Sequence, residues 1–283
     1  MTSSNWKSSK EFFAELTGKP RFGLFSDLDG TLSPIAPTPE AAQIAPRNRE
    51  LLAGLRDEIA LVAIISGRRA DNLQQSVVLP GVVYIGNHGL ERWEDGEIKI
   101  AAEAKPYLSA IHAAEKELKT IDGAGIRVEE KGPTLSFHYR QVENRIAFAR
   151  NIAPRLTEIA EKHDLELFTG KMVFEFRPPV GVDKGIAFEQ LVSEYKLEAA
   201  LFLGDDVSDL SAIRMARKLR EQQTCDAWGI GVQSREAPEV LAETADFLAD
   251  GVEDVEDLLS WLLKASKETH PFHIIPRSNH VSS

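Results

Sequence analysis

Short runs of consecutive apolar residues, separated by segments with helical spacing, recur in the first and last thirds of the chain. We predict strands at residues 22–25, 61–65, 82–86, 199–203 and 228–232. Between the first two, residues 47–57 carry leucines at helical spacing, and further helices are expected at 183–195 and 255–263. Strands buried on both faces of a sheet show continuous apolar runs, and strand–helix–strand units build parallel sheets. These segments therefore predict an α/β core with a Rossmann-like parallel sheet.

Between about residues 106 and 177 the pattern changes to alternation of polar and apolar residues within the strands. Helices are expected at 107–120 and 142–162, and strands at 126–131, 134–140, 165–168 and 172–177. Alternation is typical of antiparallel strands that have one buried face. We therefore predict that an α+β domain is inserted into the parallel-sheet core.

The chain, with 283 residues, is long for one hydrophobic core, so a division into domains is expected. We predict an N-terminal lead-in at 1–21, a catalytic core formed by 22–105 and 178–265, the inserted domain at 106–177 and a flexible tail at 266–283. Residues 33–46 hold four prolines and are expected to form an irregular excursion.

The formal net charge of −11 argues against a general nucleic-acid surface or an anionic membrane surface as partner. The chain has one cysteine, Cys225, so an intramolecular disulfide is excluded, and a cytoplasmic location is expected. We find no secretory signal, and no window approaches the roughly 18 uninterrupted apolar residues of a membrane span. We therefore expect no nucleic-acid partner and no membrane association.

The first apolar run ends in two carboxylates, Asp27 and Asp29, which are followed by Gly30 and Thr31. Alternation along a strand points both carboxylates the same way, at the sheet edge where parallel sheets bind ligands. Asp and Gly are also common in ordinary turns. However, like charges this close repel unless a cation lies between them, and oxygen ligands suit Mg²⁺. The hydroxyl and backbone N–H of Thr31 are suited to hold a phosphate oxygen.

Further polar residues follow other predicted strands. Ser66 follows the second strand, where it suits a phosphoryl oxygen or caps the next helix. Lys184 lies in the first turn of a helix capped by Asp183, and a cation there requires an anionic partner. After the strand at 199–203 come Asp205, Asp206 and Asp209, and we expect the first two of these to bind Mg²⁺ together with Asp27 and Asp29.

This set of residues suits phosphoryl transfer by attack of a carboxylate. The stretch from Asp27 to Thr31, with Ser66, Lys184 and residues 204–209, resembles the four motifs of the haloacid dehalogenase-like phosphatases. The resemblance implies that Asp27 attacks phosphorus, that Asp29 is the general acid and base, and that Lys184 pairs with the phosphate. It also implies that residues 106–177 form a cap domain.

Other segments narrow the resemblance to the trehalose-6-phosphate phosphatase family, over about residues 22–263. They are residues 32–35, 65–68, 86–89, 129–132, 138–140, 175–178, 183–185 and 204–206. The resemblance implies a sugar-phosphate substrate and a trehalose-phosphate synthase acting alongside the enzyme. It implies these substrate-binding residues: Thr31, Ser66, Gly67, Arg68, Asn87, His88, Glu129, Lys131, Arg140 and Glu175.

Several alternatives stay open. On residues alone, His88 is equally a satisfied loop histidine, and the charged residues of the inserted domain are equally a solvated strand face. Leu210 stands where the family usually has Glu, which weakens the choice of substrate. The other candidates are a phosphatase for sucrose phosphate or for mannosyl- or glucosyl-3-phosphoglycerate, and a non-catalytic sugar-phosphate-binding regulatory module. Such modules usually lose the nucleophile or metal ligands, which are present here.

Overall fold

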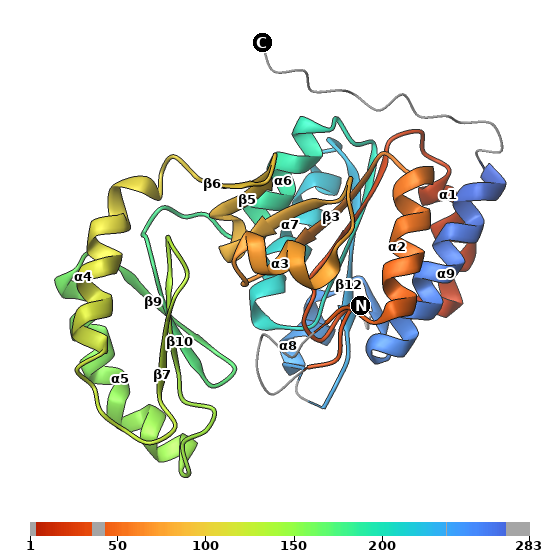
Figure 1. Ribbon diagram of the computed structural model, residues 1–283. Coiled ribbons are helices and arrows are strands. Elements are labelled where there is room, and N and C mark those ends of the chain that lie inside the picture. The colour runs from red at the N-terminus through yellow and green to blue at the C-terminus, as the bar shows by residue number, and fades with distance from the viewer. Residues whose placement is uncertain (1–3, 36–42, 236, 270–283) are drawn as a thin grey trace. The chain divides into compact units, whose positions relative to one another are not determined.

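The computed structural model describes residues 4–35, 43–235 and 237–269, and it falls into two units (Figure 1). Unit 1 comprises Met1–Ser66, Leu73–Tyr84 and Asp183–Ser283, and unit 2 comprises Gly67–Asn72 and Ile85–Val182. The chain therefore leaves unit 1 and returns to it, as an insertion requires. The predicted cap at 106–177 lies within unit 2, and its function as a cap stays a prediction.

Unit 1 is built on a parallel sheet. Its strands, in their order across the sheet, are β1 (Ser4–Asn5), β13 (Phe247–Ala249), β12 (Asp226–Val232), β11 (Ala199–Gly204), β2 (Phe22–Ser26) and β3 (Leu61–Ile65). Every pair of neighbours in this series runs parallel. β4 (Val83–Gly86) follows β3 in the sheet order. Because the strands are parallel, the loops after β2, β3 and β11 lie at one edge.

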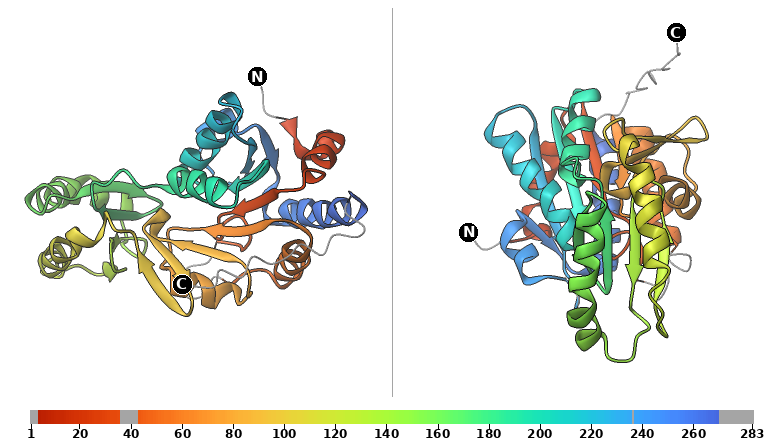
Figure 2. Two further views of the ribbon diagram at one scale, coloured as in Figure 1. Left: turned by 90° about the horizontal axis from the view of Figure 1, so that it is seen from above. Right: turned by 90° about the vertical axis from the view of Figure 1, so that its left-hand side faces the viewer.

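Helices cover both faces of this sheet. They are α1 (Lys10–Thr17), α2 (Pro46–Glu58), α6 (Lys184–Glu194), α7 (Leu210–Glu221), α8 (Glu239–Thr244) and α9 (Gly251–Thr269), while α3 (Ala70–Val77) has residues in both units. The helix α6 packs against α7, and α9 packs against α1 and α2. Figure 2 shows the first pair on one side of the strands and the second group on the other. This is the predicted α/β class of fold.

The buried strands explain why the apolar runs are continuous. Every residue of β2, β3 and β11 is buried, since helices pack on both faces. The helix α6 begins where the sequence predicts, because the Asp183 side chain accepts a hydrogen bond from the Ile186 N–H at 2.9 Å. Pro46 starts α2, where its fixed φ suits the first helical turn.

Unit 2 contains two antiparallel structures. The strands β5 (Glu91–Glu94) and β6 (Glu97–Ile100) form a hairpin. The second structure is a four-stranded sheet in the order β7 (Arg127–Glu130), β8 (Leu135–His138), β10 (Val173–Arg177) and β9 (Glu166–Gly170). The helices α4 (Leu108–Leu118) and α5 (Arg145–Lys162) pack on one face of this sheet (Figure 1). Their core includes Ile111, Phe137, Leu156 and Phe174.

Short 3-10 turns complete the described chain: η1 (Trp6–Ser9), η3 (Asn87–Gly89), η4 (Lys105–Tyr107) and η5 (Val207–Asp209). The predicted lead-in packs into unit 1, because β1 pairs with β13 and Trp6 and Phe13 are buried. Residues 266–269, assigned to the tail from sequence, are the last turn of α9. The remainder of that tail, 270–283, lies outside the described residues, as do 1–3 of the lead-in and 36–42 of the proline-rich excursion.

The sequence did not predict β1, β5, β6, β13, α7 or α8. The strands among them are short or lie in polar segments, so their apolar runs are weak. In the parts of the chain that the structure describes, no helix is both long and apolar enough to cross a membrane.

Candidate active site

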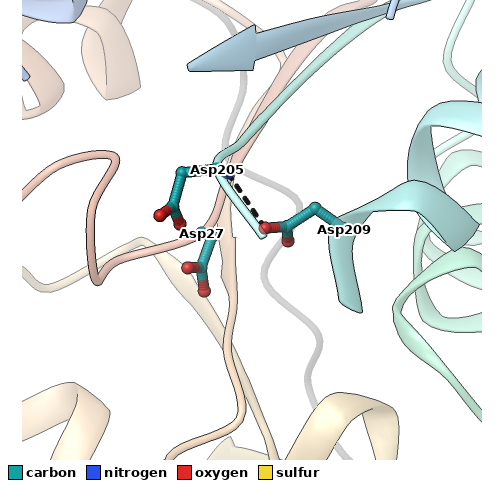
Figure 3. Close-up of side chains that lie close together, drawn as sticks. All are labelled: Asp27, Asp205 and Asp209. Carbon is teal, nitrogen blue, oxygen red and sulfur yellow. Dashed lines mark hydrogen bonds between the residues drawn. The ribbon is translucent and has the colours of Figure 1, made fainter. Parts of the chain in front are cut away.

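Three aspartates converge at the carboxyl edge of the unit 1 sheet. Asp27 follows β2, while Asp205 and Asp209 follow β11, the neighbouring strand (Figure 3). Each offers one carboxylate oxygen, and these oxygens lie within 4.8 Å of one another. All three residues are buried. Asp27 and Asp205 lie at the strand ends where the sequence predicts them, and their role as metal ligands stays a prediction. Asp209 was not selected as a ligand from the sequence.

Lys184 is the cation of this group. Its Nζ lies 2.9 Å from Asp27 Oδ1 and 2.7 Å from Asp209 Oδ1, and the residue is 2% exposed. The expected anionic partner of Lys184 is therefore confirmed. Burial lowers the pKa of Lys184, but the carboxylates of Asp209 and Asp27 outweigh this and raise it, so the ammonium stays charged.

One ammonium does not balance three buried carboxylates. Burial raises the pKa of Asp27 to about 8; Lys184 opposes the shift, whereas Asp209, Asp205 and Asp29 add to it. A protonated carboxyl group is a poor nucleophile, so attack on phosphorus requires Asp27 to be ionised. A bound dication would reverse this effect because it stabilises the charged form. The donor set, hard carboxylate oxygens with excess negative charge, therefore fits Mg²⁺.

Asp209 holds the group together. Its Oδ2 accepts hydrogen bonds from the backbone N–H groups of Asp205 and Asp206, each at 3.0 Å, while its Oδ1 binds Lys184. A Cβ at Gly204 would lie 2.3 Å from the Asp209 carboxyl carbon, so glycine is required there. The sequence signal that was available is spacing: Asp209 follows Asp205 by one helical turn.

The loop after β2 also approaches its neighbours too closely for a side chain at Gly30. Gly30 has φ +82°, and a Cβ there would lie 2.3 Å from Asp205 Oδ2. This close approach is why glycine follows the two aspartates. The Thr31 hydroxyl is buried and has no hydrogen-bond partner among the described residues, which fits the predicted phosphate contact. Ser66 is buried at the end of β3, the strand next to β2.

Two predicted metal ligands are not in the three-aspartate group. Asp206 instead caps η5, since its side chain accepts a hydrogen bond from the Val207 N–H at 2.8 Å. Asp29 lies in the turn after Asp27 and forms a β-bridge with Ser33. Their roles as ligands, and the role of Asp29 as acid and base, stay predictions.

A second charge cluster lies in unit 2, around Glu175 on β10. Its Oε1 accepts a hydrogen bond from Lys131 Nζ at 2.6 Å, and its Oε2 lies 3.0 Å from His88 Nε2 and 3.0 Å from Arg177 Nε. Lys131 Nζ also donates to the carbonyl of Gly67 at 2.9 Å. Four predicted substrate-binding residues are therefore neighbours in this cluster: Gly67, His88, Lys131 and Glu175. Arg177 was not predicted as a site residue.

The basic side chains around Glu175 determine the direction of its pKa shift. Burial raises its pKa, but Lys131, His88 and Arg177 outweigh burial and hold the pKa of Glu175 well below its usual value. The carboxylate therefore remains ionised, and its two oxygens are occupied by these donors. Within unit 2 it positions basic side chains.

The loop that carries His88 is strained and braced. Asn87 and His88 have φ values of 47° and 59°, which are uncommon for residues other than glycine. The Asn87 carboxamide donates to the Lys131 carbonyl at 2.7 Å and accepts from Thr134 Oγ1 at 2.8 Å. A Cβ at Gly67 would lie 2.6 Å from His88 Nε2, so glycine makes room for the ring.

Glu91 is a further brace that the sequence did not reveal. It is 2% exposed, and its Oε2 accepts a hydrogen bond from the Ala70 N–H, at the start of α3, at 2.9 Å. Burial raises the pKa of Glu91 against the effect of this hydrogen bond. Glu91 therefore accepts one of the N–H groups at the start of α3, and it links residues 67–72 to β5 within unit 2. The role of Ser66 as a helix cap stays a prediction.

The remaining predicted residues are more exposed. Glu129 Oε2 contacts His138 Nε2 at 2.8 Å and Arg127 at 3.0 Å. Burial raises the pKa of Glu129, but the His138 hydrogen bond and the charges of Lys131, His138 and Arg127 bring it below its usual value. Arg140 follows β8, and Arg68 precedes α3; both are half-buried. Their contacts with substrate stay predictions.

Solved structures identify the class of fold. The chain superimposes on a haloacid dehalogenase-like hydrolase from Bacteroides thetaiotaomicron with a TM-score of 0.55 and 18% identity, covering 85% of this chain and 98% of that one. The C-terminal domain of trehalose-6-phosphate phosphatase from C. albicans gives a TM-score of 0.76 at 21% identity, with 93% and 98% coverage. The fold is therefore haloacid dehalogenase-like.

The sequence comparison identifies the family within that class. The trehalose-phosphatase family model matches residues 25–240, so this chain belongs to the trehalose-phosphatase family. The trehalose-phosphate phosphatase of Mycobacterium tuberculosis is 34% identical over 199 residues, which cover 67% of this chain and 50% of that protein. This chain therefore spans about half the length of this relative.

Proposed function

We propose that this protein is a Mg²⁺-dependent phosphatase that hydrolyses trehalose 6-phosphate to trehalose and phosphate through an aspartyl-phosphate intermediate. The observation that carries the proposal is the buried group of three carboxylates around Lys184, in a chain of the trehalose-phosphatase family. The metal itself would be held by Asp27, Asp205 and Asp209, with Asp29 or Asp206 as further predicted ligands. When bound, Mg²⁺ supplies positive charge that keeps Asp27 ionised and neutralises the phosphate.

In the first step, the Asp27 carboxylate attacks phosphorus and the bond between phosphorus and the sugar oxygen breaks. Asp29 gives its proton to the leaving oxygen. In the second step, Asp29 takes a proton from water, the water oxygen attacks phosphorus, and the bond to Asp27 breaks to release phosphate. Lys184 orients Asp27 through the 2.9 Å contact, and the unpaired Thr31 hydroxyl suits a phosphate oxygen.

The sugar part of the substrate would bind to unit 2. Lys131, Glu129, Arg140 and the residues around Glu175 present the kind of charged donors and acceptors that bind sugar hydroxyls. Residues 106–177 would act as a cap that excludes water from the phosphorylated aspartate. The protein would act in the cytoplasm, as its single cysteine leads us to expect, and a trehalose-phosphate synthase would supply the substrate.

The test is phosphate release from a panel of sugar phosphates. The purified protein is assayed on trehalose 6-phosphate, sucrose phosphate, mannosyl- and glucosyl-3-phosphoglycerate, and p-nitrophenyl phosphate, with Mg²⁺ or with excess EDTA. We expect the highest kcat/KM on trehalose 6-phosphate and no turnover with EDTA. If another sugar phosphate gives the highest kcat/KM, trehalose 6-phosphate is not the preferred substrate, but the phosphatase mechanism still stands. Full activity in EDTA would reject the metal, and no turnover of any substrate would reject the enzyme.

A further inference from the structure

The four-stranded sheet of unit 2 has two chemically different faces. Alternate residues such as Phe137, Phe174 and Leu167 belong to the core under α4 and α5. The register places the other residues in rows that cross all four strands. One of these rows consists of Glu129 on β7, Ser136 on β8, Glu175 on β10 and Phe168 on β9. The row is polar except for its last member.

Phe168 is unusual in this row. The residue is 41% exposed, although its neighbour along the strand, Leu167, packs into the helical core. On this polar face its benzyl group gains less from burial than the core side chains on the other face of the sheet. It lies directly opposite Glu175 in the register of β9 and β10. An aromatic ring therefore stands beside the charge cluster to which the proposed function assigns the sugar.

The ring is also tied to that cluster. The Arg177 guanidinium lies over the Phe168 ring, 4.5 Å from its centroid, and its Nε donates to Glu175 Oε2 at 3.0 Å. Glu175 in turn binds Lys131 at 2.6 Å. This cation–π contact fixes the ring relative to the hydrogen-bonding groups while leaving much of the ring accessible. One connected group is thus formed by Phe168 on β9, by Glu175 and Arg177 on β10, and by Lys131, the residue after β7.

This combination suits a pyranose ring. A glucosyl unit with equatorial hydroxyls has a rim of donors and acceptors and two faces made of C–H groups. The C–H groups pack on an aromatic face, whose negative charge attracts their positive edge, while charged side chains bind the rim. A purely solvated strand face would need only the charged residues.

We propose that Phe168 is a specificity-determining residue whose ring stacks on the C–H face of one glucosyl unit of the substrate. The inference rests on the proposed function for its substrate class, a disaccharide phosphate. It adds a stacking contact to the hydrogen bonds expected from the charged residues of the same sheet.

The kinetic test compares Phe168→Ala, Phe168→Leu and Phe168→Trp with the wild-type chain. Ile146→Ala is the matched control, because Ile146 is an 88% exposed apolar residue of unit 2 on α5. An aromatic contact of this kind is worth about three- to tenfold in KM. We expect the Ala and Leu variants to raise KM for trehalose 6-phosphate by this factor, with p-nitrophenyl phosphate unchanged. The Trp and Ile146→Ala variants should stay near wild type.

A second test does not depend on catalysis. Trehalose is titrated into the full-length Phe168→Trp variant and into the wild type, and the difference in tryptophan emission is measured, with sorbitol as the acyclic control. Trehalose should change the emission of the variant in a saturable way and sorbitol should not. If the wild type hydrolyses no sugar phosphate, the proposed function is wrong. The titration would still show whether trehalose binds beside residue 168. Unchanged KM in Phe168→Ala, or emission that trehalose does not alter, overturns the stacking role.

Discussion

The two charge clusters of this protein are both buried, but their excess charge has opposite sign. In unit 1, Lys184 pairs with two of three clustered buried carboxylates, so negative charge is in excess, and burial together with this excess raises the pKa of Asp27 to about 8. In unit 2, Lys131, Arg177 and His88 surround Glu175, and the pKa of that carboxyl falls well below its usual value. Burial raises both pKa values, so the balance of neighbouring charges decides the difference.

The difference separates two tasks. A cluster with excess negative charge is costly to fold without a cation, which is the condition for a metal site. A cluster in which several donors surround one carboxylate needs no added cation, because the basic groups and the carboxylate neutralise each other. The following experiments test this contrast.

The largest effect is expected for Asp27→Asn. The amide keeps the size of the side chain but lacks the charge needed for attack, so kcat should fall by roughly 10³-fold or more on every phosphate ester. Phosphate release on trehalose 6-phosphate and p-nitrophenyl phosphate measures this, and circular dichroism checks the fold. The control Asp57→Asn changes an exposed aspartate of α2 and should be near wild type. Near-normal turnover in Asp27→Asn would mean that another group is the nucleophile.

For Glu175→Gln we expect a large loss of stability. The change leaves Lys131 and Arg177 without their buried counter-charge, at a cost of about 3–5 kcal/mol in the free energy of unfolding. Urea unfolding measures the loss, and hydrolysis of trehalose 6-phosphate should decline more than that of p-nitrophenyl phosphate. Glu166→Gln, at an exposed position on β9, is the matched control. Equal stability of the two variants would contradict a counter-ion role for Glu175.

In unit 1, by contrast, a carboxylate-to-amide change should increase the free energy of unfolding. Without metal, Asp205→Asn removes one repelling charge and should stabilise the protein by about 0.5–2 kcal/mol. Thermal unfolding in EDTA measures this gain. Added Mg²⁺ should raise the Tm of the wild type and should raise that of Asp205→Asn much less, because one ligand is lost. If Asp205→Asn is destabilising in EDTA, negative charge is not in excess at this site.

The smallest effect is a pH dependence of stability. In the folded protein the pKa of Asp27 is raised from 3.8 to about 8, so the folded state keeps a proton that the unfolded state releases. Metal-free wild type should therefore lose stability as pH rises through this window, relative to Asp27→Asn. The pKa of Glu175 is shifted in the opposite direction, so its effect on stability has the opposite pH dependence. Its ionised carboxylate contributes to stability above the usual pKa of 4.5, and this contribution is lost as pH falls through the lowered pKa of the folded state. Tm values in EDTA between pH 5 and pH 8 test the Asp27 part, and parallel curves for the two proteins would refute it.

Much of the fold was predictable because the signals are local. The continuous apolar runs of β2, β3 and β11 reflect burial on both faces, and Asp183 caps α6 through a residue three positions away. The short strand β1 was not predictable, because two polar residues form a strand only by pairing with β13.

The candidate site divides in the same way. Asp27 and Asp29 were recognised since both follow an apolar strand, but Asp209 was not selected as a ligand. Its importance comes from Lys184 and from the backbone N–H groups it binds, which the fold brings to it. Arg177 and Phe168 were missed for a similar reason: their significance depends on the register of β9 against β10.

The sequence by itself determined the order of elements, the insertion between parts of a parallel sheet, and the residues that end its strands. Only the tertiary structure decided that Asp27, Asp205 and Asp209 converge beside one cation, which pairs with Asp27 and Asp209, and that Glu175 is surrounded by basic groups. The physical reason is that propensity and capping act over a few neighbouring residues, whereas burial and charge balance are sums over groups that are distant in the chain. The ionisation of each carboxylate follows from that sum.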